Sequence, residues 1–99
     1  MRSRPRERID VRLPEYTSDK HHRELGAFAR YCILRVEREL GEREAWRVDI
    51  ALSLRGYSSR VSVDDRGIVL EERGNGSDGT LATWDAMCRI EQRLRERRL

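Results

Sequence analysis

The sequence predicts an α+β domain in which two helices pack on one face of a four-stranded sheet, in the order β-α-β-β-β-α. Two segments carry apolar residues three and four positions apart, which is the spacing of a helix with one buried stripe. Four shorter segments alternate apolar and polar residues, which is the pattern of a strand with one buried face. Because every element has a single apolar side, both helices are expected to cover the same side of an open sheet.

The N-terminal segment, residues 1–8, combines four arginines with Pro5 and is expected to be a flexible basic arm. The remaining chain, residues 9–99, has the length of a single domain. Residues 9–13 alternate apolar and charged side chains, which predicts a first strand with one buried face, and Pro14 is expected to end it.

The first helix is expected to begin at Thr17, Ser18 or Asp19, because these side chains can accept hydrogen bonds from the free N–H groups of a first turn. Gly41 is expected to end it, since glycine readily adopts the conformation that follows a helix. Its predicted buried stripe consists of Leu25, Phe28, Ala29, Cys32, Ile33, Val36 and Leu40.

The strongest strand signal lies in residues 46–54, where five apolar side chains alternate with polar or small ones. The predicted inward residues of this strand are Trp46, Val48, Ile50, Leu52 and Leu54. Gly56 marks a turn, Val61 and Val63 a shorter strand, and residues 64–67 a hairpin turn. Residues 68–73 complete the sheet, with Ile68 and Leu70 inward. The opposite face is expected to present to water Arg12, Arg47, Asp49, Ser53, Arg55 and Arg60.

Residues 74–79, with the sequence GNGSDG, are expected to form a flexible loop before the last helix. Asp78 or Thr80 is the predicted N-cap of that helix. The polar C-terminal end, RLRERRL, is expected to fray. The predicted buried stripe of this helix consists of Thr80, Trp84, Met87, Ile90 and Leu94.

The sequence lacks the residue groupings that most enzymes need. It contains no glycine-rich phosphate loop, no nucleophile elbow and no cysteine spacing typical of zinc sites. His21 and His22 are adjacent, so on a helix they point in different directions and are not expected to share a ligand. Cys32 and Cys88 fall in the two helices and are expected to be buried or half-buried thiols, with a disulfide the less favoured alternative. We therefore expect a protein that is not an enzyme and that binds no cofactor and no metal.

Membrane insertion and secretion are also not indicated. No apolar run approaches the roughly 18 residues of a membrane-spanning helix. The charged N-terminus lacks the apolar segment of a secretory signal. A cytoplasmic protein without a membrane partner is expected.

Basic residues mark the expected outer faces of both helices. The first helix carries Arg23, Arg30 and Arg38 with Tyr31 and Leu34, a combination that suits contact with RNA phosphates and bases. The last helix carries Arg89, Arg93 and Arg97 four positions apart, which would be easier to explain beside a polyanion. Two plainer explanations stay open: a solvated charged face on the first helix, and cations favoured by the dipole at the end of the last.

The element order, the glycine-flanked acidic loop and the basic tail of the last helix resemble the ribosome hibernation-promoting factor and protein Y family, also called the sigma-54 modulation or ribosome-subunit-interface family. In that family the last helix opens with an Asp-x-Tyr-Ala-Ala-Ile-Asp-like segment. The family helix then runs through leucine-rich positions to a Lys/Arg-rich end. Here Asp78 and Ala82 fit the opening segment and Ile90 and Leu94 fit the later apolar spacing, whereas Thr80 replaces the tyrosine.

The resemblance covers about residues 9–98 and is to the short family form. It implies a fold similar to double-stranded RNA-binding domains and a factor that inhibits translation in hibernating ribosomes. It further implies that the partner is the small ribosomal subunit and its rRNA. The expected RNA-binding residues are Arg23, Arg30, Tyr31, Arg38, Arg89, Arg93 and Arg97.

A protein-interaction module without RNA binding is the alternative that the sequence leaves open. Tyr31, Leu34 and Ala27 would then form the contact patch on the first helix. A homodimer formed by edge-strand pairing is a further expectation of this kind.

Overall fold

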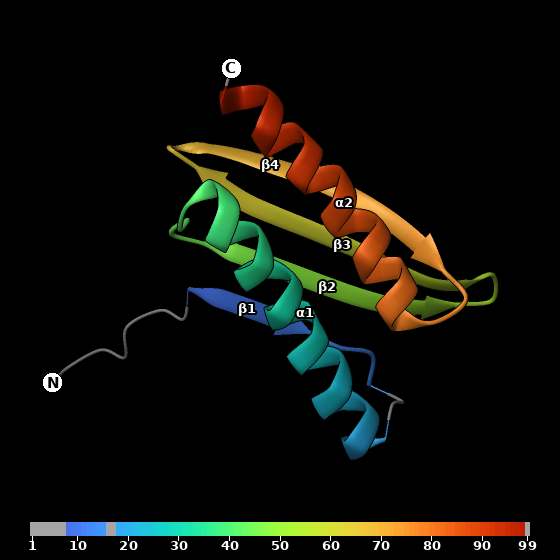
Figure 1. Cartoon of the computed structure of the whole chain (residues 1–99). Coiled ribbons are helices and arrows are strands. Elements are labelled where there is room, and N and C mark those ends of the chain that lie inside the picture. The colour runs from blue at the N-terminus through green and yellow to red at the C-terminus, as the bar shows by residue number, and fades with distance from the viewer. Residues whose placement is uncertain (1–7, 16–17, 99) are drawn as a thin grey trace, which may run out of the picture.

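The computed structural model describes residues 8–15 and 18–98 and has the predicted α+β architecture. Its sheet has the order β1-β2-β3-β4, with β1 parallel to β2 and the other neighbours antiparallel. Figure 1 shows both helices side by side on one face of this sheet, which confirms the predicted fold class. The elements are β1 (Ile9–Arg12), α1 (Asp19–Leu40), β2 (Trp46–Ser53), β3 (Gly56–Asp65), β4 (Ile68–Gly76) and α2 (Gly79–Arg98).

Most of the expected basic arm, residues 1–7, lies outside the described residues, as does Thr17. Arg8 is described, and it is anchored to the domain rather than extended from it. Its guanidinium forms an ion pair with Glu37 and donates a hydrogen bond to the Arg43 carbonyl oxygen at 3.1 Å. The ordered domain therefore includes Arg8.

Local capping chemistry sets the two ends of α1. The Ser18 hydroxyl accepts a hydrogen bond from the His21 amide at 3.2 Å, so Ser18 is the N-cap. At the other end Gly41 has a φ of 97° and donates its amide to the Glu37 carbonyl at 2.8 Å. The predicted end of the helix and its buried stripe are confirmed, except that Phe28 is only partly buried.

The core lies between the helices and the covered face of the sheet. Trp46, Val48 and Ile50 are buried as predicted. The inward assignment of Leu52 and Leu54 is wrong, because Leu52 is 54% exposed and Leu54 fully exposed. The β2–β3 hairpin projects beyond the start of α2 (Figure 1), so no helix covers its end. Ile68 is also exposed, against expectation, at the turn that joins β3 to β4.

The central hairpin is longer than the sequence pattern indicates. β3 runs from Gly56 to Asp65 rather than only around Val61 and Val63. The predicted turn is confirmed: Arg66 and Gly67 connect the strands with φ values of 55° and 88°. Two successive positive φ values are typical of the tight turn that matches the twist of antiparallel strands.

The expected loop at residues 74–79 is wrong for its first half, since Gly74, Asn75 and Gly76 belong to β4. The glycines serve helix packing rather than chain flexibility. A Cβ atom on Gly74 would lie 2.3 Å from the Ala82 carbonyl oxygen and from the Ala86 amide nitrogen. On Gly76 a Cβ atom would lie 2.6 Å from the Ala82 amide nitrogen. Helix α2 thus approaches the backbone of β4 so closely that only glycine fits.

This close approach also sets the rotation of α2. Ala82, Thr83 and Ala86 are buried together with the predicted Met87, Ile90 and Leu94. The assignment of Trp84 to the core is wrong, because its side chain is 42% exposed. The small alanines face the glycines of β4, and the larger Trp84 is turned outward. The polar C-terminal segment is helical as far as Arg98.

Of the two predicted N-cap candidates of α2, Asp78 and Thr80, the structure has Asp78 in this position. Its Oδ1 accepts hydrogen bonds from the Leu81 amide at 2.9 Å and from the Thr80 hydroxyl at 2.6 Å. These hydrogen bonds, the one from Thr80 first, lower the pKa of the Asp78 carboxyl.

Replacing this cap should weaken the domain measurably. We expect Asp78→Ala to lower the free energy of unfolding by about 1 kcal/mol, because the amides of the first turn lose their acceptor. Asp78→Asn, which keeps the acceptor oxygen, should retain most of the stability. Urea denaturation followed by circular dichroism measures both variants. Equal losses for alanine and asparagine would contradict the capping role.

Candidate nucleic-acid interface

Charge is distributed unevenly between the layers of the domain. Helix α1 carries five Lys or Arg residues against four Asp or Glu residues, and α2 carries five against three. Residues 41–78, which hold three of the four strands, carry six basic residues and eight acidic residues. The helix layer therefore bears a formal charge of +3 and the segment beneath it −2, so the helices form the more positive side of the domain.

The three arginines predicted on the outer face of α1 are distributed along the helix. Arg23, Arg30 and Arg38 are all exposed, and among the described residues none of them forms an ion pair with a carboxylate. Arg30 makes a single long hydrogen bond, 3.4 Å, to the Gly26 carbonyl of its own helix. Tyr31 and Leu34 are exposed on the same face. The guanidinium groups on this face are thus available to an external anion.

The three predicted arginines of α2 are placed differently, because each contacts a carboxylate. Arg89 lies 3.4 Å from Asp85, and Arg93 lies 3.1 Å from Glu72. Arg93 also donates to the Glu71 carbonyl oxygen at 3.3 Å. Arg97 forms an ion pair with Asp65. Arg93 and Arg97 therefore point toward the strands beneath α2, and their charges are largely neutralised within the domain.

A buried ion network explains the position of Arg97. The Asp65 side chain is only 5% exposed and lies between Arg97 and Arg43, whose Nε is 2.9 Å from Asp65 Oδ1. Burial alone would raise the pKa of Asp65, but hydrogen bonds from Arg97 and Arg43 hold that pKa below its ordinary value. Arg43 also donates to the carbonyl oxygens of Leu40 and Gly41, at 3.0 and 2.8 Å. The network joins the ends of α1, β3 and α2.

A second buried carboxylate lies beside it. Glu37 is 7% exposed, and its Oε2 accepts from the Trp46 indole at 3.0 Å and from the Arg43 amide at 2.8 Å. The ion pair with Arg8 completes this group. Sequence reasoning missed both networks, because residues that form ion pairs in them are up to 32 positions apart.

The exposed surface between the helices carries an aromatic cluster that sequence reasoning did not identify. The ring centroids of Phe28 and Tyr31 are 6.5 Å apart, and those of Phe28 and Trp84 are also 6.5 Å apart. The Arg35 guanidinium carbon lies 5.1 Å from the Trp84 ring centroid. Arg35 is held there by Glu91, at 2.7 Å. Gly74 and Gly76 of β4 were the sequence signal that could have revealed this cluster, because they allow the Ala82 and Ala86 side of α2 to face the sheet and so place Trp84 outward.

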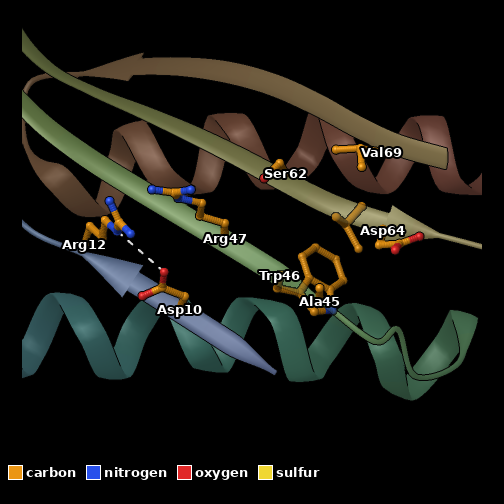
Figure 2. A pocket seen from close by; sticks show the side chains of 9 residues that line it. Asp10, Arg12, Ala45, Trp46, Arg47, Ser62, Asp64 and Val69 are labelled. Carbon is orange, nitrogen blue, oxygen red and sulfur yellow. Dashed lines mark ion pairs between the residues drawn. The ribbon is translucent and has the colours of Figure 1, made fainter. Parts of the chain in front are cut away.

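The opposite face of the sheet has mixed charge. An open hollow of about 480 Å³ lies there, lined by residues of β1, β2, β3 and β4. Figure 2 shows the side chains of Asp10 and Arg12 at this hollow pointing toward one another, and the two side chains are 3.5 Å apart. Arg47 lies 3.3 Å from Asp49, and Arg60 lies 3.6 Å from Asp49. The predicted water-facing residues do lie on this side or at its hairpin, with Asp49 partly buried. Their charges compensate one another, so this face presents no uniform potential to a ligand.

The thiols and histidines do not form a reactive or metal-binding group. Burial raises the pKa of the Cys32 thiol to about 11, so it is protonated at neutral pH. Cys88 is exposed, unlike the expected half-buried thiol, and both cysteines are free. The His22 Nε2 atom lies 2.6 Å from the Pro14 carbonyl oxygen. Within residues 8–15 and 18–98, no group of three or more His, Cys, Asp or Glu side chains could hold a metal ion.

Neither helix of the described chain is long and apolar enough to cross a membrane. No family model matches the sequence, and no curated protein matches it.

Solved structures do match the fold. One is the crystal structure of the Thermus thermophilus protein Y N-terminal domain, with a TM-score of 0.72 and 16% sequence identity, covering 91% of this chain and 98% of that one. Another is a ribosomal subunit interface protein from Coxiella burnetii, with a TM-score of 0.72 and 13% identity, covering 91% and 96%. This chain therefore has the fold of protein Y and of ribosomal subunit interface proteins, which confirms at the level of fold the resemblance seen in the sequence.

Proposed function

We propose that this protein is a ribosome-associated factor of the cytoplasm that binds small-subunit rRNA and inhibits translation in hibernating ribosomes. The observation that carries the proposal is the match, over nine-tenths of the chain, to two structures named for protein Y and for the ribosomal subunit interface. The more positive helix layer supports it, since RNA phosphates are attracted to such a surface.

The primary contact in this proposal is the outer face of α1, with Arg23, Arg30 and Arg38. Within residues 8–15 and 18–98 these guanidinium groups form no ion pair with a carboxylate, so binding phosphate breaks no ion pair found in this part of the chain. Arg89, Arg93 and Arg97 form a second contact region on α2. Their side chains are 35–57% exposed, so phosphate can reach them once they exchange their carboxylate partners.

Reversing the charge of α1 tests this surface. We expect R23E/R30E/R38E to weaken cosedimentation with small ribosomal subunits on the order of 100-fold at low salt, because three attractive interactions with phosphate become repulsive. The dependence of log affinity on log salt should become shallower by about three, one for each phosphate that is no longer bound. Sucrose-gradient sedimentation at several salt concentrations measures both quantities.

The matched control is R12E/R55E/R73E, which makes the same change in net charge on the sheet side of the domain. This control should keep most of the affinity. Equal losses in the two triple variants would show that only net charge matters, and would contradict a defined binding surface on α1. Reversal of the α2 arginines is a poorer test, because it also breaks the pair between Arg97 and buried Asp65.

The protein-interaction alternative has one feature in its favour, the exposed Tyr31 and Leu34 on the outer face of α1.

Edge-strand dimerisation through β4 has less support. The backbone N–H of Asn75 already donates a hydrogen bond to the Asp85 carboxylate at 3.1 Å. The backbone carbonyl of Glu71 accepts one from the Arg93 guanidinium. Side chains of α2 thus occupy part of the edge that a second copy would need.

A further inference from the structure

We infer that Trp84 and Tyr31, supported by Phe28, form a stacking platform for unpaired RNA bases beside the arginines of α1. The inference rests on the proposed function and deepens it, because it names the kind of RNA element that the helix layer recognises. That element would have flipped-out or single-stranded nucleotides next to a phosphate backbone, rather than an uninterrupted duplex.

The two outer rings of this platform are accessible from solvent. Trp84 is 42% and Tyr31 58% exposed, and both belong to the helix layer. Trp46, the other tryptophan of the chain, is buried and hydrogen-bonded to Glu37. Phe28 lies between the two exposed rings, at 6.5 Å from each, and is itself only partly buried. The three rings thus form one connected aromatic surface across α1 and α2.

An arginine side chain packs against the Trp84 ring. The Arg35 guanidinium lies over the Trp84 ring at 5.1 Å and is tied to Glu91 at 2.7 Å. Glu91 in turn accepts from Arg95 at 2.8 Å, so the support for Trp84 is itself fixed. A ring held in place loses little conformational entropy when a base stacks on it.

The charge around the platform favours RNA over a protein partner. Helix α1, which carries Phe28 and Tyr31, also carries Arg30 and Arg38, which have no carboxylate partner among the described residues. Aromatic rings beside unneutralised guanidinium groups match the two parts of a nucleotide, its base and its phosphate. The other large exposed apolar residues are aliphatic: Leu34 and Leu81 lie on the two helices, and Leu52, Leu54, Ile68 and Val69 lie at or near the hairpin turns.

The test compares oligomers that differ only in their bases. An eight-nucleotide oligouridine and a ribose-phosphate oligomer of the same length without bases carry the same phosphates. We expect the oligouridine to bind the intact protein at least about ten-fold tighter and to quench tryptophan fluorescence, whereas the abasic oligomer should leave it unchanged. Buried Trp46 should contribute a constant background, so the quenching reports Trp84.

Three variants connect this difference in affinity to the platform. Trp84→Ala should bring the affinity for oligouridine down to that for the abasic oligomer, and Trp84→Phe should restore part of the difference. Tyr31→Ala should reduce the ratio of the affinity for oligouridine to that for the abasic oligomer, while leaving Trp84 and its contact with Arg35 in place. Circular dichroism and thermal unfolding of each variant separate a loss of stacking from a loss of folding.

The outcomes distinguish this inference from the proposed function. If the protein cosediments with small subunits but binds both oligomers equally, the platform is overturned and ribosome association stands. If base-dependent binding occurs without any ribosome association, the platform stands and the proposed function fails. If instead the protein self-associates with increasing concentration and Trp84→Ala abolishes this, the patch serves a second copy and the inference is overturned.

Discussion

Replacing Gly74 with alanine is expected to lower the free energy of unfolding by at least about 3 kcal/mol. The added Cβ atom would lie 2.3 Å from two backbone atoms of α2, the Ala82 oxygen and the Ala86 nitrogen. No rotation of a side chain relieves such a clash, so the helix must move away from β4. That movement would loosen the packing of Met87 and Ile90, which are fully buried.

Gly26→Ala provides the matched control for this substitution. Gly26 is also buried, but it lies within α1, and the nearest atom to its added Cβ is the end of the Arg30 side chain at 3.3 Å. A flexible side chain can move, and alanine favours a helix over glycine by roughly 1 kcal/mol. Gly26→Ala should therefore be neutral or stabilising in urea denaturation. Similar stabilities for the two variants would show that α2 does not pack against β4 as closely as described.

Asp65→Asn should have a comparable effect through electrostatics. We expect a loss of about 3 kcal/mol at neutral pH, because Arg43 and Arg97 would lose the carboxylate that joins them. Glu71→Gln is the control, since Glu71 is exposed and lies 3.6 Å from Arg60, and surface pairs of this kind contribute less than roughly 1 kcal/mol. Denaturation of both variants at pH 7 measures the difference. Equal, small losses would contradict a buried network.

The same variant predicts a direction for the dependence of stability on pH. Because the pKa of Asp65 is lower in the folded protein than its ordinary value, the ionised carboxylate stabilises the fold at all pH values above that ordinary value. The contribution is lost as the pH falls from about 4 through the folded pKa. The stability difference between the wild type and Asp65→Asn should therefore narrow on acidification below about pH 4. A constant difference would mean that Asp65 does not titrate within the network.

Much of the fold was predictable because its signals are local. The three-and-four spacing in α1, the caps at Ser18 and Gly41, and the positive-φ turn at Arg66–Gly67 each depend on residues close together in the chain. The errors occur where a residue type has two possible roles. Gly74 and Gly76 resemble a loop in sequence but are strand positions that admit a helix backbone. Leu52 and Leu54 continue an alternating pattern beyond the point where a helix covers it.

The candidate site was less predictable, because charge availability depends on distant partners. Arg30 and Arg93 look alike in the sequence, yet the first has no ion pair among the described residues and the second is bound to Glu72. Glu91 holds Arg35 from 56 positions away and thereby supports Trp84. No local pattern indicates these partners.

The sequence by itself determined the element order, the single apolar side of each element and the presence of arginines on both helices, because periodicity and capping are encoded in neighbouring residues. Only the tertiary structure decided which arginines form ion pairs with described carboxylates and which aromatic rings face outward. The physical reason is the rotation of α2: packing against the glycines of β4 draws the alanine side of the helix to the sheet. That rotation directs Arg93 and Arg97 to carboxylates on the strands and leaves Trp84 at the surface beside α1.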